Sequence, residues 1–192
     1  MVNQNIITRF WHDLNDSIKH NILENYNRVY DNFLLGYFDD QFKYVLDKLG
    51  VNVNEIFVKA CNSLDLDSID MCLKMGANPY LCEEGIRKAT SFNNREMVEY
   101  FINNSKVSNI YTDCLRITCV QGYIELAELF IKKGADVNVD YGACLKLAAI
   151  NGRLGIIKLL VSKGASKKCS TAMRWARKEG YKDVVEYLQS IT

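Results

Sequence analysis

The stretch YGACLKLAAINGRLGIIKLLVSKGA, residues 141–165, decides the fold because much of it recurs elsewhere in the chain. It ends on Gly164 and Ala165, and the earlier stretch LFIKKGA ends on Gly134 and Ala135 in the same way. We call the glycine of this Gly-Ala pair the mark of a unit, and the residues at the corresponding place in earlier units are Gly50, Gly76 and Ser105. The marks are 26 to 30 residues apart. A unit this short cannot bury an apolar face alone, so the sequence predicts a solenoid of stacked units.

Each unit is predicted to contain two short helices. Segments of sixteen residues that begin at positions 57, 86, 115, 145 and 173 align without gaps. A small residue stands midway along every first helix, where it lets neighbouring helices approach: Ala60, Ala89, Thr118, Ala148 and Ala176. In four units the residue between the two helices is one that tolerates a left-handed backbone: Asn93, Gly122, Gly152 and Gly180. The pattern therefore predicts an all-α stack of helix pairs.

The segment GADVN at 134–138, followed by LAAINGRLGIIKLLVSKGA at 147–165, resembles the ankyrin repeat. The resemblance covers residues 31–192 and implies about five to six units, the first and last degenerate. The family's Thr-Pro-Leu-His opening is replaced by DCLR at 113–116, ACLK at 143–146 and TAMR at 171–174. The period is also shorter than the usual ~33 residues. The resemblance implies that the missing residues shorten the projecting hairpin turns.

The resemblance carries expectations about function. It implies a non-enzymatic protein that binds another protein through the concave face of the solenoid. The variant openings also resemble divergent ankyrin families of giant amoeba-infecting DNA viruses. That likeness implies a host protein as the partner, and the host cytoplasm or the virion as the location.

Composition excludes several classes of protein. No apolar run approaches the ~18 residues of a membrane span, and the first residues lack a secretory pattern, so we expect an intracellular protein that is a monomer. The seven cysteines are odd in number and form no Cys-x-x-Cys pair, which favours buried thiols over a metal site. Both histidines, His12 and His20, precede the repeats. Without a catalytic or phosphate-binding motif, neither an enzyme nor a cofactor is expected.

One aligned position holds a cation in four successive units: Arg87, Arg116, Lys146 and Arg174. Stacking would place these side chains in a row, which we call the basic column. The column has a structural interpretation, in which each cation donates hydrogen bonds to turn carbonyls. It also has a functional one, a stripe that binds an acidic or phosphorylated partner. Nucleic acid is less favoured, because no row of aromatic residues accompanies the column.

A second set of candidate contact residues follows the small mid-helix residue by two or three places. In the family such positions are exposed on the binding face, and here they include Phe92, Val120, Gln121, Ile150 and Asn151. Three of them are apolar, and exposed apolar surface often marks a partner site. The alternative is that these side chains are half-buried between units. Trp175 is expected in the core.

The two ends of the chain offer further alternatives. Residues 131–192 carry twelve Lys and Arg against five Asp and Glu, although the whole chain has a net charge of only +1. This basic half favours an acidic or nucleic-acid ligand. Residues 1–30 do not fit the repeat and predict a helical cap. Within them LNDSIKHNIL, residues 14–23, loosely resembles the start of an F-box, which implies a substrate adaptor for a ubiquitin ligase.

Overall fold

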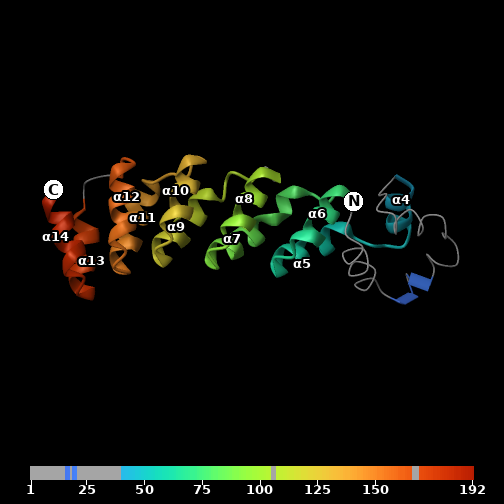
Figure 1. The fold of residues 1–192 in the computed structure, drawn as a ribbon, viewed down its shortest axis with the longest axis horizontal. Coiled ribbons are helices and arrows are strands. Elements are labelled where there is room, and N and C mark those ends of the chain that lie inside the picture. Colours follow the sequence, from blue (N-terminus) through green and yellow to red (C-terminus); the bar gives the residue numbers. More distant parts are fainter. Residues whose placement is uncertain (1–15, 18, 21–39, 105–106, 166–168) are drawn as a thin grey trace. The chain divides into compact units, whose positions relative to one another are not determined.

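The structure is a computed structural model that describes residues 16–17, 19–20, 40–104, 107–165 and 169–192 (Figure 1). These residues form helices and turns, with no β-strand among them, so the all-α prediction is confirmed. The chain divides into two compact units, Met1–Gly85 and Ile86–Thr192. The predicted cap at 1–30, its boundary with the array and the F-box-like segment at 14–23 lie outside the described residues, apart from two short pieces of helix at 16–17 and 19–20.

The described part of the first unit contains one complete helix pair, α5 and α6. From residue 40 on, its elements are α4 (Asp40–Lys48), α5 (Val53–Ser63), α6 (Leu66–Lys74) and the short 3₁₀ helix η1 (Pro79–Cys82). Helix α5 packs against α6 and η1, and the fully buried side chains Phe57, Ile69 and Met71 fill the contact. Asp65 caps α6, because its carboxylate accepts hydrogen bonds from the amide and the hydroxyl of Ser68.

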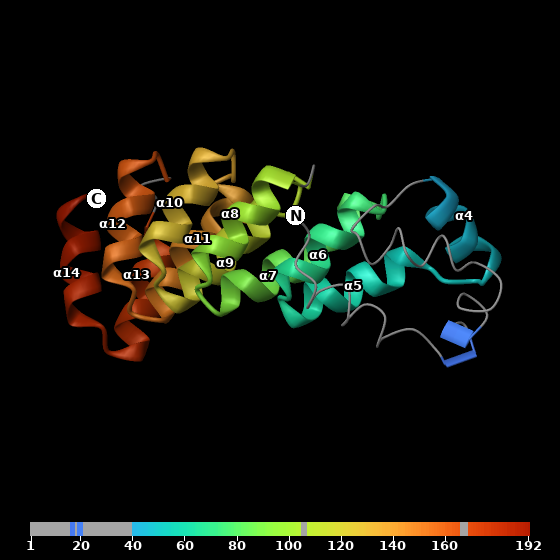
Figure 2. The ribbon, with the colours of Figure 1, turned by 45° about the vertical axis from the view of Figure 1, so that its right-hand side comes forward.

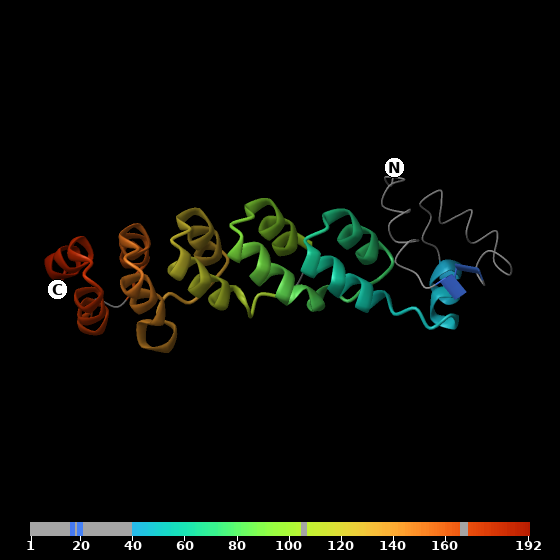
Figure 3. The same cartoon turned by 90° about the horizontal axis from the view of Figure 1, so that it is seen from below.

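The second unit is a series of helix pairs in chain order (Figures 2 and 3). Its helices are α7 (Glu83–Ser91), which begins at the end of the first unit, α8 (Arg95–Asn104), α9 (Tyr111–Gln121), α10 (Ile124–Lys132), α11 (Val139–Ile150), α12 (Leu154–Ser162), α13 (Ser170–Glu179) and α14 (Lys182–Ser190). Helix α11 packs between α9 and α13, and α12 packs between α10 and α14. We call the row α7, α9, α11 and α13 the inner layer, and the row α8, α10, α12 and α14 the outer layer.

The small mid-helix residues lie where the inner helices meet, as predicted. The side chains of Ala89, Thr118, Ala148 and Ala176 have no solvent exposure, and Ala60 of the first unit is buried too. The Thr118 hydroxyl donates a 2.7 Å hydrogen bond to the Leu115 carbonyl, so this polar group is satisfied inside the core.

The turn between the two helices of a pair is left-handed, which confirms a second prediction. The φ angles are 54° at Asn93, 92° at Gly122, 65° at Gly152 and 84° at Gly180. The corresponding residue of the first unit is Leu64, which adopts φ 57° without the freedom of a glycine.

Two of the connections that the structure describes in full are hydrogen-bonded turns. Between α10 and α11 the Asp136 amide donates to the Thr112 hydroxyl at 3.1 Å, and the Asp136 carboxylate accepts from the Asn138 amide at 2.8 Å. The first unit repeats this arrangement, because the Asn78 amide donates to the Asn54 side chain at 2.7 Å. Within the described residues these turns replace a hairpin of strands.

Helix α11 begins with a feature that the repeat pattern did not predict. Asp140, Tyr141 and Gly142 all have positive φ angles, of 48°, 55° and 88°, before the regular helix continues. A left-handed backbone costs a residue with a Cβ about 1–2 kcal/mol. The turn directs the Asp140 carboxylate toward α9 and leaves the Tyr141 side chain fully exposed.

Candidate partner-binding surface

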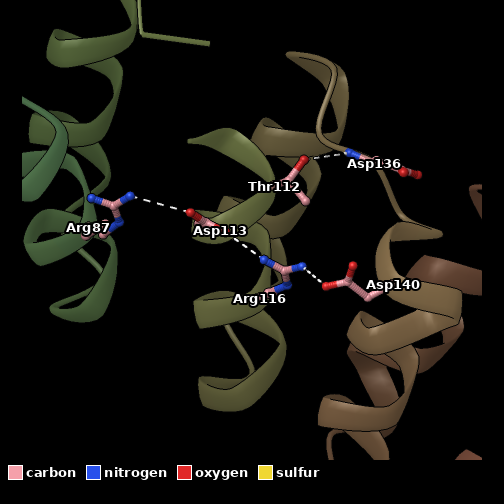
Figure 4. Close-up of polar contacts among 6 residues, drawn as sticks. All are labelled: Arg87, Thr112, Asp113, Arg116, Asp136 and Asp140. Carbon is pink, nitrogen blue, oxygen red and sulfur yellow. Dashed lines mark hydrogen bonds and ion pairs between the residues drawn. The ribbon is translucent and has the colours of Figure 1, made fainter. Parts of the chain in front are cut away.

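The first two cations of the basic column form a ladder of ion pairs along the inner layer (Figure 4). The Arg116 guanidinium contacts Asp113 of its own helix at 2.6 Å and Asp140 at the start of α11. The other oxygen of Asp113 lies 3.4 Å from the guanidinium of Arg87 on α7. Asp113 therefore bridges two cations, and the ladder Arg87–Asp113–Arg116–Asp140 links α7, α9 and α11.

The partners in this ladder differ from those the sequence predicted. We expected turn carbonyls to accept hydrogen bonds from the column, whereas Arg116 contacts the carboxylates of Asp113 and Asp140. The Arg116 side chain is 29% exposed and Asp140 70%, so each pair is screened by water and contributes at most about 1 kcal/mol. The spacing of Asp113 three residues before Arg116 on one helix could have revealed the first pair. The pair with Asp140 depends on the left-handed turn and left no signal in the sequence.

The last two cations of the column have no carboxylate partner within the described residues. Lys146 and Arg174 are exposed, and neither forms an ion pair there. The Lys146 ammonium lies 5.7 Å from the centre of the Trp175 ring, and Lys178 lies 4.8 Å from the same ring. Trp175 is half-buried between these lysines, whereas we expected it in the core. The column thus changes from paired to unpaired charges along the second unit.

The other predicted contact residues differ in their exposure. Phe92 is 68% exposed at the end of α7, and Gln121 is exposed at the end of α9. Val120 and Ile150 are half-buried, which agrees with the alternative interpretation that such side chains lie partly between units. Asn151 is also half-buried, and its amide donates to the Leu147 carbonyl at 2.8 Å, so it closes the end of α11. The structure leaves Phe92 as the large apolar side chain of this set with the most exposure.

The residue after three of the left-handed turns, those at Gly122, Gly152 and Gly180, reaches back to the preceding helix pair, a feature that our sequence reasoning missed. The Tyr123 hydroxyl donates to the Ser91 carbonyl at 3.3 Å, and Arg153 Nε donates to the Val120 carbonyl at 2.9 Å. A Cβ on Gly152 would lie 2.5 Å from the Tyr181 ring, so that ring covers the turn before it. These contacts hold the ends of the inner helices in a fixed row. The sequence signal for these contacts was the large side chain that directly follows each of these three glycines: Tyr123, Arg153 and Tyr181.

The acidic, histidine and cysteine side chains of the described residues do not gather into a metal site. The described residues contain no group of three or more His, Cys, Asp or Glu side chains that could hold a metal ion. All seven cysteines are free and buried, as predicted. Burial raises the pKa of Cys61 and Cys72 to about 12 and that of Cys114 to about 11, so these thiols stay protonated near neutral pH and are poor nucleophiles.

No helix of the described part has both the length and the apolar character that crossing a membrane requires. Among the curated proteins no sequence matches the chain. A family model described as ankyrin repeats, in three copies, matches residues 86–170 and 115–191, which together exceed half of the chain. Proteins of this family are typically binding modules without catalysis and mediate protein–protein interactions. The repeated helix pairs, the buried small residues and this match agree, and the chain belongs to the ankyrin-repeat family.

Proposed function

We propose that this chain is a non-enzymatic intracellular monomer that binds another protein through the ends of its inner helices. The observation that carries the proposal is Phe92, a large aromatic side chain that is 68% exposed beside a row of fixed helix ends. Exposed aromatic residues on a rigid support are favourable anchors for a partner, because little conformational entropy is lost when they bind.

The arrangement around Phe92 supports this proposal. The hydrogen bond from Tyr123 to the Ser91 carbonyl fixes the backbone next to Phe92. Gln121 adds an exposed amide on the next helix, which can donate and accept hydrogen bonds at the rim of a contact. An apolar anchor with a polar rim is the usual anatomy of a protein interface.

The proposal includes the array boundaries and the partner's source. We infer that the repeats occupy residues 31–192 and that residues 1–30 form a helical cap. The variant first-helix openings, such as DCLR at 113–116, support an origin in a giant amoeba-infecting virus, and with it a host protein as the partner. No cofactor takes part in binding of this kind.

A capture experiment tests the proposal with matched variants. Three proteins are immobilised and incubated with a cell lysate: the parent, the double variant Phe92→Ala with Gln121→Ala, and the control Ile124→Ala. The proteins that bind to each are then quantified by mass spectrometry. Ile124 is also apolar and exposed, but it opens the outer helix α10. We expect the double variant to lose the proteins that both the parent and the control retain. Equal recovery by all three proteins contradicts the proposal.

A further inference from the structure

The basic column divides into a paired half and an unpaired half, and the unpaired half lies beside an aromatic ring. Arg87 and Arg116 meet carboxylates, whereas Lys146 and Arg174 meet none within the described residues. Lys178, four residues after Arg174 on α13, is also exposed and also lacks a carboxylate there. We call Lys146, Arg174 and Lys178, together with Trp175, the terminal basic patch.

The geometry gathers these three cations on two packed helices. Lys146 comes from α11 and the others from α13, which packs directly against it. Two ammonium groups lie within 5.7 Å of the centre of one indole ring. Residues four apart on a helix share a face, so Arg174 and Lys178 are neighbours that repel each other by a few tenths of a kcal/mol. A bound anion would remove that repulsion.

Helix stability alone does not account for the patch. Lys178 lies in the last turn of α13, where a cation interacts favourably with the helix dipole. That effect fades within one turn, so it explains neither Arg174 near the middle of the helix nor Lys146 on α11. The acidic groups on the same elements are Glu179, which is exposed, and Asp140, which pairs with Arg116.

We propose that the terminal basic patch binds an acidic segment, rich in Asp and Glu, of the partner protein. The inference rests on the proposed function, since the segment belongs to the protein bound by the inner helices. Charge complementarity selects the occupant, because three exposed cations without carboxylates favour a row of carboxylates. A nucleic acid is disfavoured, because Trp175 is half-buried and a base stacking on its ring would have to displace two lysines that already lie within 5.7 Å of the ring centre.

The test measures the binding of a fluorescein-labelled glutamate-rich peptide by fluorescence anisotropy, with a glutamine-rich peptide of equal length for comparison. The patch variant carries Lys146→Ala, Arg174→Ala and Lys178→Ala. Its matched control carries Lys158→Ala, Lys163→Ala and Lys182→Ala, three exposed lysines on or beside outer helices. The control removes the same charge, and it also removes a lysine 5.6 Å from an aromatic ring, that of Tyr187.

We expect the patch variant to bind the glutamate-rich peptide about tenfold or more weakly, since each exposed charge contact contributes up to a few-fold. The control should stay within about twofold of the parent. Binding of the parent should weaken as salt is raised. Equal losses in the two variants, or tighter binding of an oligothymidine than of the peptide, would overturn the inference.

A second readout places the peptide at the patch itself. The chain has two tryptophans, so Trp11→Phe leaves Trp175 as its sole source of indole fluorescence. The glutamate-rich peptide should change the emission of Trp175, because it draws the lysines away from the ring. Peptide binding with unchanged emission would refute the placement. If the peptide fails to bind while Phe92→Ala with Gln121→Ala still loses its cellular partner, the proposed function stands and this inference falls.

Discussion

Gly152 is under two separate constraints, and each excludes a side chain. Its φ of 65° costs alanine about 1 kcal/mol, and an added Cβ would lie 2.5 Å from the ring of Tyr181. Because that ring can shift only by uncovering the turn, we expect Gly152→Ala to lower the free energy of unfolding by about 1–3 kcal/mol. Urea denaturation followed by circular dichroism measures the loss.

Gly155 is the matched control, because it is a glycine of the same unit in ordinary helical conformation. An added Cβ would lie 2.6 Å from the Cδ1 atom and 3.5 Å from the Cγ1 atom of Ile124, an exposed side chain whose flexible end can move aside. Alanine also favours a helix over glycine by about 1 kcal/mol, so Gly155→Ala should be neutral or stabilising. A similar loss in both variants would show that the left-handed turn does not restrict Gly152.

Some backbone conformations of single residues could be predicted from the sequence, and others could not. The left-handed turns were predictable, because glycine and asparagine are the residues that adopt such a backbone at the lowest cost. Leu64 in the same conformation was not, since its own preference opposes it and the surrounding packing must impose it. Asp140 was missed for a related reason: its contact with Arg116 depends on the left-handed backbone of Asp140, Tyr141 and Gly142, which a regular helix does not contain.

At the scale of helices, the ion-pair ladder predicts a specific dependence on salt. Arg116→Ala removes both its contact with Asp113 and its contact with Asp140, so we expect a loss of about 1 kcal/mol in the free energy of unfolding. If Arg116 donated to buried carbonyls instead, the loss in the free energy of unfolding would not depend on salt. Because one acceptor carboxylate is half-exposed and the other, Asp140, is mostly exposed, the loss should shrink in 1 M salt, where charges are screened beyond about 3 Å. Denaturation at two salt concentrations separates these cases.

The control for this prediction is an ion pair that links no helices. Arg95 and Glu99 form a 2.8 Å pair within α8, with both side chains exposed. Arg95→Ala should therefore cost no more than about 0.5 kcal/mol at either salt concentration. A larger loss in Arg95→Ala than in Arg116→Ala would contradict a stabilising role for the ladder between helices.

The helices themselves were largely predictable, because the repeat supplies several aligned copies of one pattern. Their small buried residues and turn residues fall at the same place each time. The position of Trp175 was not predictable in this way. Its aligned place suggested the core, but Trp175 is half-buried, and the ammonium groups of Lys146 on α11 and Lys178 on α13 lie near its ring. The side chains that lie near an aromatic ring come partly from the neighbouring unit. The pattern of a single unit therefore does not predict them.

At the scale of the whole molecule, buried thiols couple stability to alkaline pH. Cys61 and Cys72 lie in the first unit and Cys114 in the second, and burial raises their pKa values from 9.0 to between about 11 and about 12. An unfolded thiol releases its proton near pH 9, while these folded thiols keep theirs. Their contribution to stability is thus fully present below about pH 9 and is lost as the pH rises toward 12.

We therefore expect the free energy of unfolding to fall above about pH 9, and the thiols to account for part of the slope. Lysines and tyrosines also titrate in this range, so a variant is needed to isolate the thiols. Cys61→Ala with Cys72→Ala removes the two groups whose pKa rises to about 12, and their small side chains leave little empty volume behind. Urea denaturation at intervals of pH should give a shallower slope for this variant than for the parent. Parallel slopes would mean that these thiols ionise as readily in the folded protein as in the unfolded chain, and that the contacts around them admit water.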